Sequence, residues 1–459
     1  MKNKILFLAI SVLYTFIYFG CDDYNKLTAP GFSLGSADFS RFVSIGNSLT
    51  MAEQSSSVFE SSQMYSFGKI IANQVETVYE QATFSDPGTG GRLEVEKIEP
   101  FTLYTNPNQG SPTNLTYPAP YNNLGVKGAF LTDVLNARDQ NSCYTANFGV
   151  PNPLFDAVLR GLGTQLELAM AQQPTFATLW IGNNDILAFA TRGGLFPVTS
   201  VQQFSNEYNT VLNALASSGA DIVLGNIPDV KAAAFFRTVG PGIGLSLQQN
   251  QLPGIVYAKT SGDVGSASIN DLFGFNVLVL LSGSSAAELI GDVTGAYYTI
   301  NQIPVPPNVN TQFPFGLAPE NPWPNNLILD PDEILVVDMT VAAYNDIIET
   351  AASAKGFAVM DGFTLIRNIA ATGVTYNGIT YTAEFLQGGF YSLDGIHPTS
   401  QGYAVVANEF IKVINQRYGA SIPLIDVSTI PGTIAFKGVS MGKYGIPNIP
   451  HGALDNVLF

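Results

Sequence analysis

The residues best suited to chemistry are a serine in a turn and a histidine near the end of the chain. Ser48 lies in a Gly-Asn-Ser turn directly after the apolar, strand-like residues 42–45. A serine hydroxyl is an effective nucleophile only when a base takes its proton, and that base needs an orienting group. The chain has only 2 histidines, and His397 follows Asp394 by three residues. The sequence therefore predicts a set of Ser48, His397 and Asp394, although a Gly-Asn-Ser turn is also ordinary turn chemistry.

Two further stretches could hold the negative charge that develops when a serine attacks a carbonyl. Residues 182–185, Gly-Asn-Asn-Asp, follow the apolar run 175–181, and ligands bind at the carboxyl ends of strands in open parallel sheets. An asparagine amide there could donate a hydrogen bond to an oxyanion. A glycine in residues 125–129, Gly-Val-Lys-Gly-Ala, would let a backbone N–H approach the same oxygen. Each stretch alone is equally compatible with a turn that leaves a strand.

Apolar strands alternate with helices along most of the chain, which indicates a parallel sheet covered by helices on both sides. Strands are expected at 42–45, 175–181, 221–226 and 357–361, with one more at 93–104 inside the irregular stretch 84–120. Helices are expected at 65–79, 132–137, 154–172, 201–217, 330–354 and 399–417. Asp330, Pro331 and Glu333 have the pattern of a helix N-cap with a capping box, which we prefer to a calcium site.

The beginning of the chain has the pattern of an export signal. Lys2 and Lys4 precede the apolar run 5–19, which is too short to span a bilayer comfortably, since that takes about 20 residues. The Gly-Cys pair at its end resembles the lipobox of bacterial lipoproteins. We therefore expect a signal peptide at 1–20, lipid on Cys21, a tether at 21–40 and anchoring to a bacterial cell-envelope membrane. Secretion with a free Cys21, or an uncleaved membrane anchor, are the alternatives.

The composition excludes several classes of site and partner. A formal net charge of −16 disfavours nucleic acid, whose phosphates require basic patches. Once Cys21 is acylated, Cys143 is the only other cysteine, so no disulfide within the mature chain is expected. Two histidines and one cysteine also make a structural zinc site improbable.

The separate stretches, taken in order, resemble the SGNH (GDSL-like) hydrolase family. The resemblance rests on residues 46–49, Gly128, residues 182–185 and residues 394–398, and it covers 41–418 with insertions between the blocks. One departure is Asn47, where the family usually has aspartate. The sequence around Ser48 also differs from that of the α/β-hydrolases, because residue 50 is threonine and no Gly-x-Ser-x-Gly elbow is present.

The resemblance implies a flavodoxin-like three-layer α/β/α fold with about five parallel strands. It also implies hydrolysis of an ester or related acyl bond without a metal or a cofactor. By carry-over, Ser48 would attack the carbonyl carbon, His397 would transfer the proton and Asp394 would hold the imidazole. The N–H groups of Ser48 and Gly128 and the side chain of Asn184 would form the oxyanion hole. Lipid-like esters are the expected substrates, with a carbohydrate (acetyl) esterase and a noncatalytic binding lipoprotein as the alternatives.

The expected domain organisation is a hydrolase domain at 41–420 and a C-terminal tail at 421–459, in which His451 has no expected role. Within the domain, residues 231–324 form a long insertion that is rich in apolar residues, glycine and proline. Long connections of this kind are usually functional. The insertion is expected either to cover the cleft as an apolar lid or to pack as a small subdomain. The oligomeric state does not follow from the sequence.

Overall fold

The centre of the molecule is a four-stranded parallel sheet, seen in a computed structural model that describes residues 31–432, 441–455 and 457. The strands are β1 (Phe42–Gly46), β4 (Phe176–Trp180), β5 (Asp221–Gly225) and β10 (Ala358–Met360), in the order β1-β4-β5-β10. All residues of β1 and β4 are buried, as expected for strands covered on both faces. This confirms the predicted α/β class and the four main strands. The signal peptide, Cys21 and the first part of the tether lie outside the described residues.

The edge of the sheet beside β1 is continued by an irregular segment, residues 122–126. Ser44 N–H donates to the Asn122 carbonyl at 2.9 Å, and the N–H groups of Leu124 and Val126 donate to the carbonyls of Ser44 and Gly46. Residues Ser44 and Asn123 form a parallel bridge. The segment therefore runs alongside β1 and leads directly to Gly128, so both arrive at the same end of the sheet.

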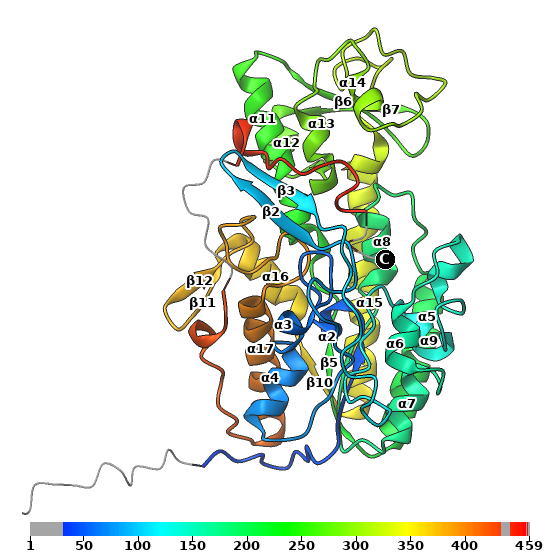
Figure 1. The fold of residues 1–459 in the computed structure, drawn as a ribbon, viewed down its shortest axis with the longest axis vertical. Coiled ribbons are helices and arrows are strands. Elements are labelled where there is room, and N and C mark those ends of the chain that lie inside the picture. The colour runs from blue at the N-terminus through cyan, green and yellow to red at the C-terminus, as the bar shows by residue number, and fades with distance from the viewer. Residues whose placement is uncertain (1–30, 433–440, 456, 458–459) are drawn as a thin grey trace, which may run out of the picture.

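Helices flank the sheet, and capping residues fix where several of them begin (Figure 1). α4 (Phe67–Gln74) packs against α17 (Ser400–Tyr418), while α9 (Val201–Ser217) packs against α15 (Pro331–Lys355). Asp330 caps α15 and forms the predicted capping box with Glu333. The other α-helices of the main body are α2 (Ser48–Met51), α3 (Glu60–Gln63), α5 (Leu131–Asn136), α6 (Leu154–Leu159), α7 (Gln165–Ala171), α8 (Asn184–Ala190) and α16 (Gly362–Ala371).

Three predicted elements are wrong in detail. The helix expected at 154–172 is two helices, because Arg160 adopts a left-handed conformation and a new capping box starts at Thr164. The strand expected at 93–104 is an antiparallel hairpin of β2 (Leu93–Ile98) and β3 (Phe101–Thr105), which turns at Glu99 and Pro100. The helix expected at 65–79 is only α4, which is followed by Glu76 in a left-handed conformation.

The insertion gathers at one end of the elongated molecule, above the β2–β3 hairpin (Figure 1). Its buried residues include an aromatic group in which Tyr297 stacks on Phe315 and Trp323 lies beside Phe315, and this group is continuous with the hydrophobic core of the main body. A middle segment of the insertion pairs with the main body, since β8 (Leu278–Val279) is antiparallel to β9 (Ile328–Leu329) just before α15. Its other elements are α10 (Ala234–Arg237), α11 (Val239–Gln249), β6 (Gly254–Ala258), β7 (Val264–Ser268), α12 (Ile269–Phe273), α13 (Ser284–Ala287) and α14 (Ala296–Ile300).

Both segments outside the expected hydrolase domain pack on it. At the end of the expected tether, Phe39 is buried and stacks on Phe176 with 4.0 Å between the ring centres. In the expected tail, the Asn448 carbonyl accepts a hydrogen bond from Leu103 N–H of β3 at 3.0 Å. The packed unit thus extends beyond 41–420 at both ends. It also includes a short hairpin, β11 (Val374–Tyr376) and β12 (Ile379–Tyr381).

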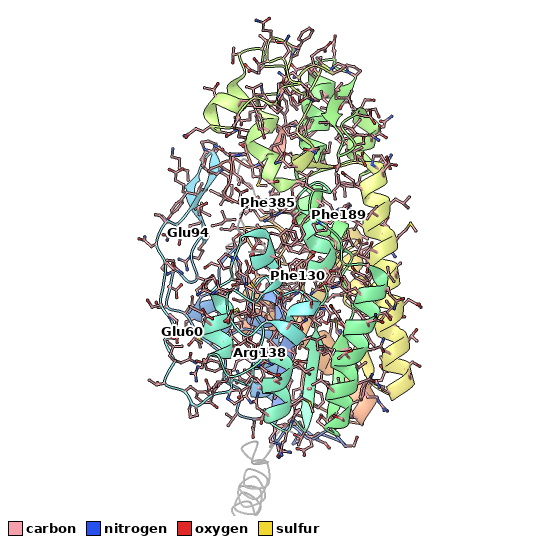
Figure 2. All side chains as sticks on the ribbon, turned by 90° about the vertical axis from the view of Figure 1, so that its right-hand side faces the viewer. Glu60, Glu94, Phe130, Arg138, Phe189 and Phe385 are labelled. Carbon is pink, nitrogen blue, oxygen red and sulfur yellow. The ribbon has the colours of Figure 1, made fainter. Side chains whose placement is uncertain are left out.

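Figure 2 shows the same molecule from the side, with α15 running along its length and the insertion at one end. None of the helices in the described ranges combines the length and the apolar character that crossing a membrane requires.

Candidate active site

Ser48 is placed at the rim of the sheet by a tight turn. β1 ends at Gly46, where a side chain would collide with the Trp180 carbonyl and the Thr50 hydroxyl, so only glycine fits. Asn47 then caps the four-residue helix α2 by accepting a hydrogen bond from Leu49 N–H at 3.2 Å. Asparagine therefore performs the capping that an aspartate could perform at this position. Ser48 is the first residue of α2 and is almost fully buried, at 4% exposure.

The loop before α17 brings the predicted histidine and aspartate to this serine. His397 Nε2 lies 2.9 Å from Ser48 Oγ, and His397 Nδ1 lies 3.0 Å from Asp394 Oδ2. Asp394 Oδ1 accepts hydrogen bonds from the N–H groups of Ile396 and His397 at 2.9 and 2.8 Å. The three predicted residues thus form one continuous line of hydrogen bonds, although Ser48 and His397 are 349 positions apart.

A turn at residues 52–57 holds this loop, and the sequence did not indicate it. Ser56 N–H donates to Asp394 Oδ2 at 2.8 Å, and Ser55 N–H donates to the Ser392 hydroxyl at 2.9 Å. Ala52, Ser55 and Ser56 all have positive φ angles, which are unfavourable for residues other than glycine. Unfavourable backbone conformations of this kind cluster at functional sites, where the surroundings enforce them.

Of the predicted oxyanion donors, the Asn184 side chain lies at the cavity that contains Ser48. Gly128 has a φ of +77°, and within the described part of the chain neither its N–H nor that of Ser48 has a hydrogen-bond acceptor. The Asn184 side chain donates from Nδ2 to the Ala129 carbonyl at 2.9 Å, which ties α8 to the residue after Gly128. Ser48, Asn184 and His397 line one cavity. The Asn184 amide therefore lies at the same cavity as Ser48, and its bond to Ala129 connects it to the segment that carries Gly128.

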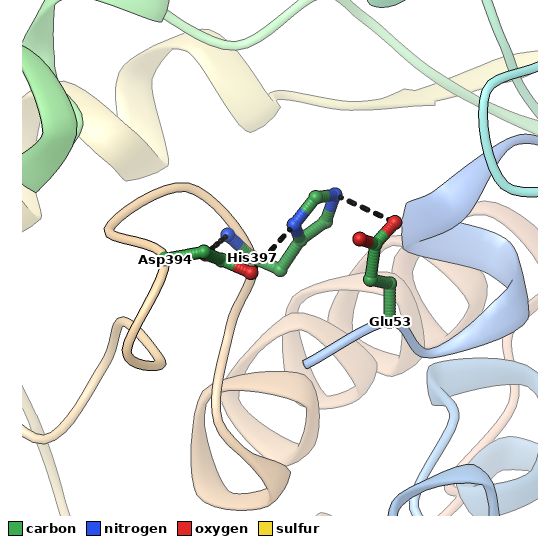
Figure 3. A group of neighbouring side chains, drawn as sticks. All are labelled: Glu53, Asp394 and His397. Atoms are coloured by element: carbon green, nitrogen blue, oxygen red, sulfur yellow. Dashed lines mark hydrogen bonds and ion pairs between the residues drawn. The ribbon is translucent and has the colours of Figure 1, made fainter. Parts of the chain in front are cut away.

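A buried glutamate and lysine complete the site, and neither was predicted. Glu53 Oε1 lies 2.7 Å from Lys127 Nζ, and Glu53 Oε2 lies 3.4 Å from His397 Nε2 (Figure 3). Glu53 is 0% exposed and Lys127 is 5% exposed. The only signal in the sequence is that each is a charged residue within a stretch of apolar and small residues.

The charges of the site act on one another. Burial lowers the pKa of His397, but the Glu53 and Asp394 carboxylates outweigh it and raise the pKa above its usual value. Burial raises the pKa of Asp394, but the adjacent His397 and two backbone N–H groups bring it below its usual value. For Glu53, burial raises the pKa despite the opposing charges of His397 and Lys127. Asp394 is therefore a carboxylate that stabilises a protonated imidazole.

The same residues also contain the one group of metal-ligand type within the described ranges. Atoms of Glu53, Asp394 and His397 lie within 4.8 Å of one another. The Lys127 ammonium already neutralises Glu53, and both Asp394 oxygens accept hydrogen bonds from N–H groups. A cation would lie next to a lysine, so the donor set fits a proton relay better than a metal.

The other histidine and cysteine lie elsewhere. His451 lines a separate cavity of about 420 Å³, together with Arg192, Phe235 and Asp455. Cys143 is buried and free. Neither lines the cavity that contains Ser48.

Comparison with known proteins found no match. None of the known family models matches the chain, and the curated proteins contain no significant relative.

Proposed function

We propose that the protein is a serine hydrolase that cleaves carboxylic esters through an acyl-enzyme. The observation that carries this proposal is the line of hydrogen bonds from Ser48 Oγ through His397 to Asp394 Oδ2. A serine held by a histidine, which is in turn oriented by a buried carboxylate, is the arrangement needed for nucleophilic attack on a carbonyl.

The reaction follows from the positions of these groups. Ser48 Oγ attacks the carbonyl carbon while His397 Nε2 takes the hydroxyl proton. The N–H groups of Ser48 and Gly128 and the amide of Asn184 stabilise the oxyanion. His397 then protonates the leaving alcohol as the intermediate collapses to the acyl-enzyme. Water, deprotonated by His397, attacks the acyl-enzyme and releases the carboxylic acid.

The finer fold assignment is part of this proposal. With residues 122–126 counted as a strand beside β1, the strands follow the order 2-1-3-4-5, which is that of flavodoxin-like sheets. This order, together with helices flanking the sheet, supports the three-layer α/β/α fold of the SGNH hydrolases, which the chain resembles.

An apolar cavity beside Ser48 favours an apolar acyl group. The cavity encloses about 70 Å³, and its surface is almost entirely apolar. Side chains from several elements contribute to it, namely Leu187, Val230, Leu365, Ile366, Phe390 and Ile396. Burial of a hydrocarbon chain against apolar walls is favourable, with a free energy of about 0.8 kcal/mol for each methylene group. We therefore place lipid-like esters ahead of acetylated sugars.

The membrane anchor remains a proposal from the sequence alone. Lipid on Cys21 would hold the enzyme at a bacterial envelope membrane, since acyl chains bind membranes through their buried methylenes. Membrane fractionation of a Cys21→Ser variant tests it, and a variant that stays fully membrane-bound would contradict it.

The decisive experiment on function is the Ser48→Ala variant. We expect it to fold normally and to lose hydrolysis of p-nitrophenyl acyl esters and labelling by a fluorophosphonate, because both need the Ser48 oxygen. Removing the nucleophile of a serine hydrolase typically removes most of the rate, on the order of 10⁶-fold. The matched control is Ser217→Ala on the exposed side of α9, which should keep full activity. A folded Ser48→Ala protein that turns over normally rejects the mechanism.

A further inference from the structure

We propose that Glu53 and Lys127 form a buried charged pair that positions His397 and strengthens it as a base during ester hydrolysis. This inference rests on the proposed function, and it assigns to Glu53 a role as a positioning residue beyond the Ser48–His397–Asp394 set.

His397 Nε2 faces two oxygens. Ser48 Oγ lies at 2.9 Å and Glu53 Oε2 lies at 3.4 Å. Asp394 accepts from Nδ1, so in the resting enzyme Nε2 carries no proton and its lone pair accepts from Ser48. The Glu53 carboxylate then faces the lone pair of Nε2 and forms no favourable interaction with the neutral imidazole.

The situation reverses once Ser48 attacks. Nε2 receives the proton, the imidazole becomes positively charged, and Glu53 Oε2 becomes an acceptor for a cation. Attraction between opposite charges at this separation is strong inside a protein, where little water screens it. Glu53 therefore stabilises the protonated histidine of the transition state more than the neutral histidine of the ground state, and only such a difference accelerates the reaction.

Lys127 makes a charged Glu53 tolerable in the interior. A buried carboxylate without a partner is strongly unfavourable and tends to take up a proton. Lys127 Nζ lies 2.7 Å from Glu53 Oε1 and also donates to the Ser56 carbonyl at 2.8 Å. The ammonium thereby binds the turn that holds Asp394, and Lys127 directly precedes Gly128. The pair thus connects the segment that carries Gly128 to the turn at 52–57, which holds the catalytic loop, residues 392–398.

The surroundings of His397 contain few other charges. Asp394, Glu53 and Lys127 act on the pKa of His397, with Glu53 and Asp394 raising it and Lys127 lowering it. Asp229 and Tyr391 also line the cavity at His397, and both stay unchanged in the variants described below. The buried Tyr403 hydroxyl donates to the Glu53 backbone carbonyl at 2.8 Å, so it fixes the backbone of Glu53 rather than its carboxylate. A change in the basicity of His397 can therefore be traced to the pair when Asp394 is left intact.

The test is the pH profile of kcat/KM for a p-nitrophenyl ester in three enzymes: wild type, Glu53→Gln, and Glu53→Gln with Lys127→Met. The double variant removes both charges and guards against misfolding from an unpaired lysine. We expect the midpoint to be highest in the wild type, about one unit lower in the double variant, and lowest in Glu53→Gln, where Lys127 repels the imidazolium.

The values of kcat/KM should also show that His397 is a weaker base in the double variant. On the high-pH plateau, kcat/KM of the double variant should fall by roughly threefold to tenfold. The deficit should shrink at low pH, where more of its histidine is neutral. Glu349→Gln, on an exposed part of α15, removes the same charge far from the site and should leave the profile unchanged.

A direct titration separates this inference from the proposed function. The imidazole of His397 can be followed by NMR in Ser48→Ala proteins that also carry His451→Gln, which leaves one histidine. The same order of pKa values is expected there without any turnover. Identical midpoints in all three enzymes, as a neutral Glu53 would give, overturn the inference even if Ser48→Ala is inactive. A pH-independent loss would mean that the pair only supports packing, and would also overturn it.

Discussion

At the scale of single residues, the two hydrogens of the Asn184 amide have different roles. One hydrogen of Nδ2 bonds to the Ala129 carbonyl at 2.9 Å. An amide nitrogen carries two hydrogens, and the second remains for an oxyanion on the substrate. The bond to Ala129 also fixes the amide beside the segment that carries Gly128.

Asn184→Ala should therefore lower kcat by roughly 10²–10³, the usual effect of removing one oxyanion donor, with little change in KM. Kinetics on a p-nitrophenyl ester measure both constants. Asn183→Ala is the matched control, because Asn183 is the same residue type and lines the same cavity. We expect it to stay within about threefold of the wild type, since the proposed oxyanion hole uses Asn184 and not the neighbouring Asn183 amide, which has no hydrogen-bond partner among the described residues. Equal losses in both variants would remove Asn184 from the oxyanion hole.

The site residues that the sequence predicted stand in recognisable local patterns, whereas those that it missed do not. Ser48, Asp394 and His397 stand in short local patterns, and the structure brings them into one line of hydrogen bonds. Glu53 and Ser56 act only because the chain turns back at 52–57. That turn uses positive φ angles at alanine and serine rather than glycine. Since those residue types do not ordinarily indicate such a turn, nothing in the sequence marked it.

At the scale of elements, the catalytic loop is supported from the insertion by α10. Phe235 N–H donates to the Gly395 carbonyl at 2.9 Å. Gly395 itself has a φ of +73°, and a side chain there would lie 2.9 Å from Phe235 N and 3.1 Å from Leu281. Gly395 therefore allows the insertion to approach the loop between Asp394 and His397.

Gly395→Ala tests this support. We expect the loop to shift away from α10 and kcat to fall by at least tenfold, because misplacing a catalytic group by about 1 Å can cost 10²-fold. Gly378→Ala is the control, since Gly378 has a similar φ of +79° but no atom within 4 Å of an added side chain. It should cost only backbone strain, about 1 kcal/mol, and leave kcat unchanged. An equally active Gly395→Ala enzyme would show that the contact is dispensable.

Helices α5 and α8 contain two buried carboxyl groups. Burial raises the pKa of Asp185, at the start of α8, to about 7, and it does the same for Asp133 in α5. Both groups should be ordinary acids when the chain is unfolded, with pKa values of about 4. The folded protein therefore binds these protons more tightly than the unfolded chain does. Their stabilising effect is complete below about pH 4 and is lost as the pH rises through about 7.

Asp185→Asn should flatten this dependence. Asp185 accepts hydrogen bonds from Leu131 N–H and the Thr199 hydroxyl, and an amide can accept the first and donate to the second. We expect the melting temperature of the wild type to fall more between pH 5 and 8 than that of Asp185→Asn. Calorimetry measures both slopes. Parallel slopes would mean that Asp185 is already ionised across this range.

The ends of a helix were predictable where a capping residue and the apolar face indicate the same boundaries. α9 begins and ends as predicted, because Ser200 caps it and the apolar positions from Phe204 to Leu215 form one buried face. The break at Arg160 was not predictable in the same way. It depends on a left-handed arginine whose guanidinium is held by the carbonyls of Leu115 and Tyr117. Such tertiary hydrogen bonds override local periodicity, which here continues across the break.

At the scale of the whole molecule, the insertion is joined to the main body at several places rather than hinged at one. β8 pairs with β9, Lys231 forms an ion pair with Asp338 of α15 at 2.6 Å, and α10 contacts the catalytic loop. The aromatic group around Phe315 in its far part is continuous with the hydrophobic core of the main body. These contacts favour a supporting subdomain over the apolar lid that the sequence equally allowed.

Two matched substitutions in the insertion distinguish a support from a lid. Phe235 and Phe315 are both buried at 1% exposure, but Phe235 contacts the catalytic loop and Phe315 lies in the distal aromatic group. Replacing either with leucine should lower the stability by a similar, modest amount, about 1.5 kcal/mol or less. We expect Phe235→Leu to lower kcat equally for acetyl and long-chain p-nitrophenyl esters, because repacking of α10 shifts the backbone N–H of residue 235, which holds the Gly395 carbonyl of the loop that carries His397. Phe315→Leu should leave kcat unchanged on both substrates. A selective loss on long chains in Phe235→Leu would instead assign the insertion to acyl-chain binding, and replacement of 231–324 by a short Gly/Ser linker would then preserve acetyl-ester hydrolysis.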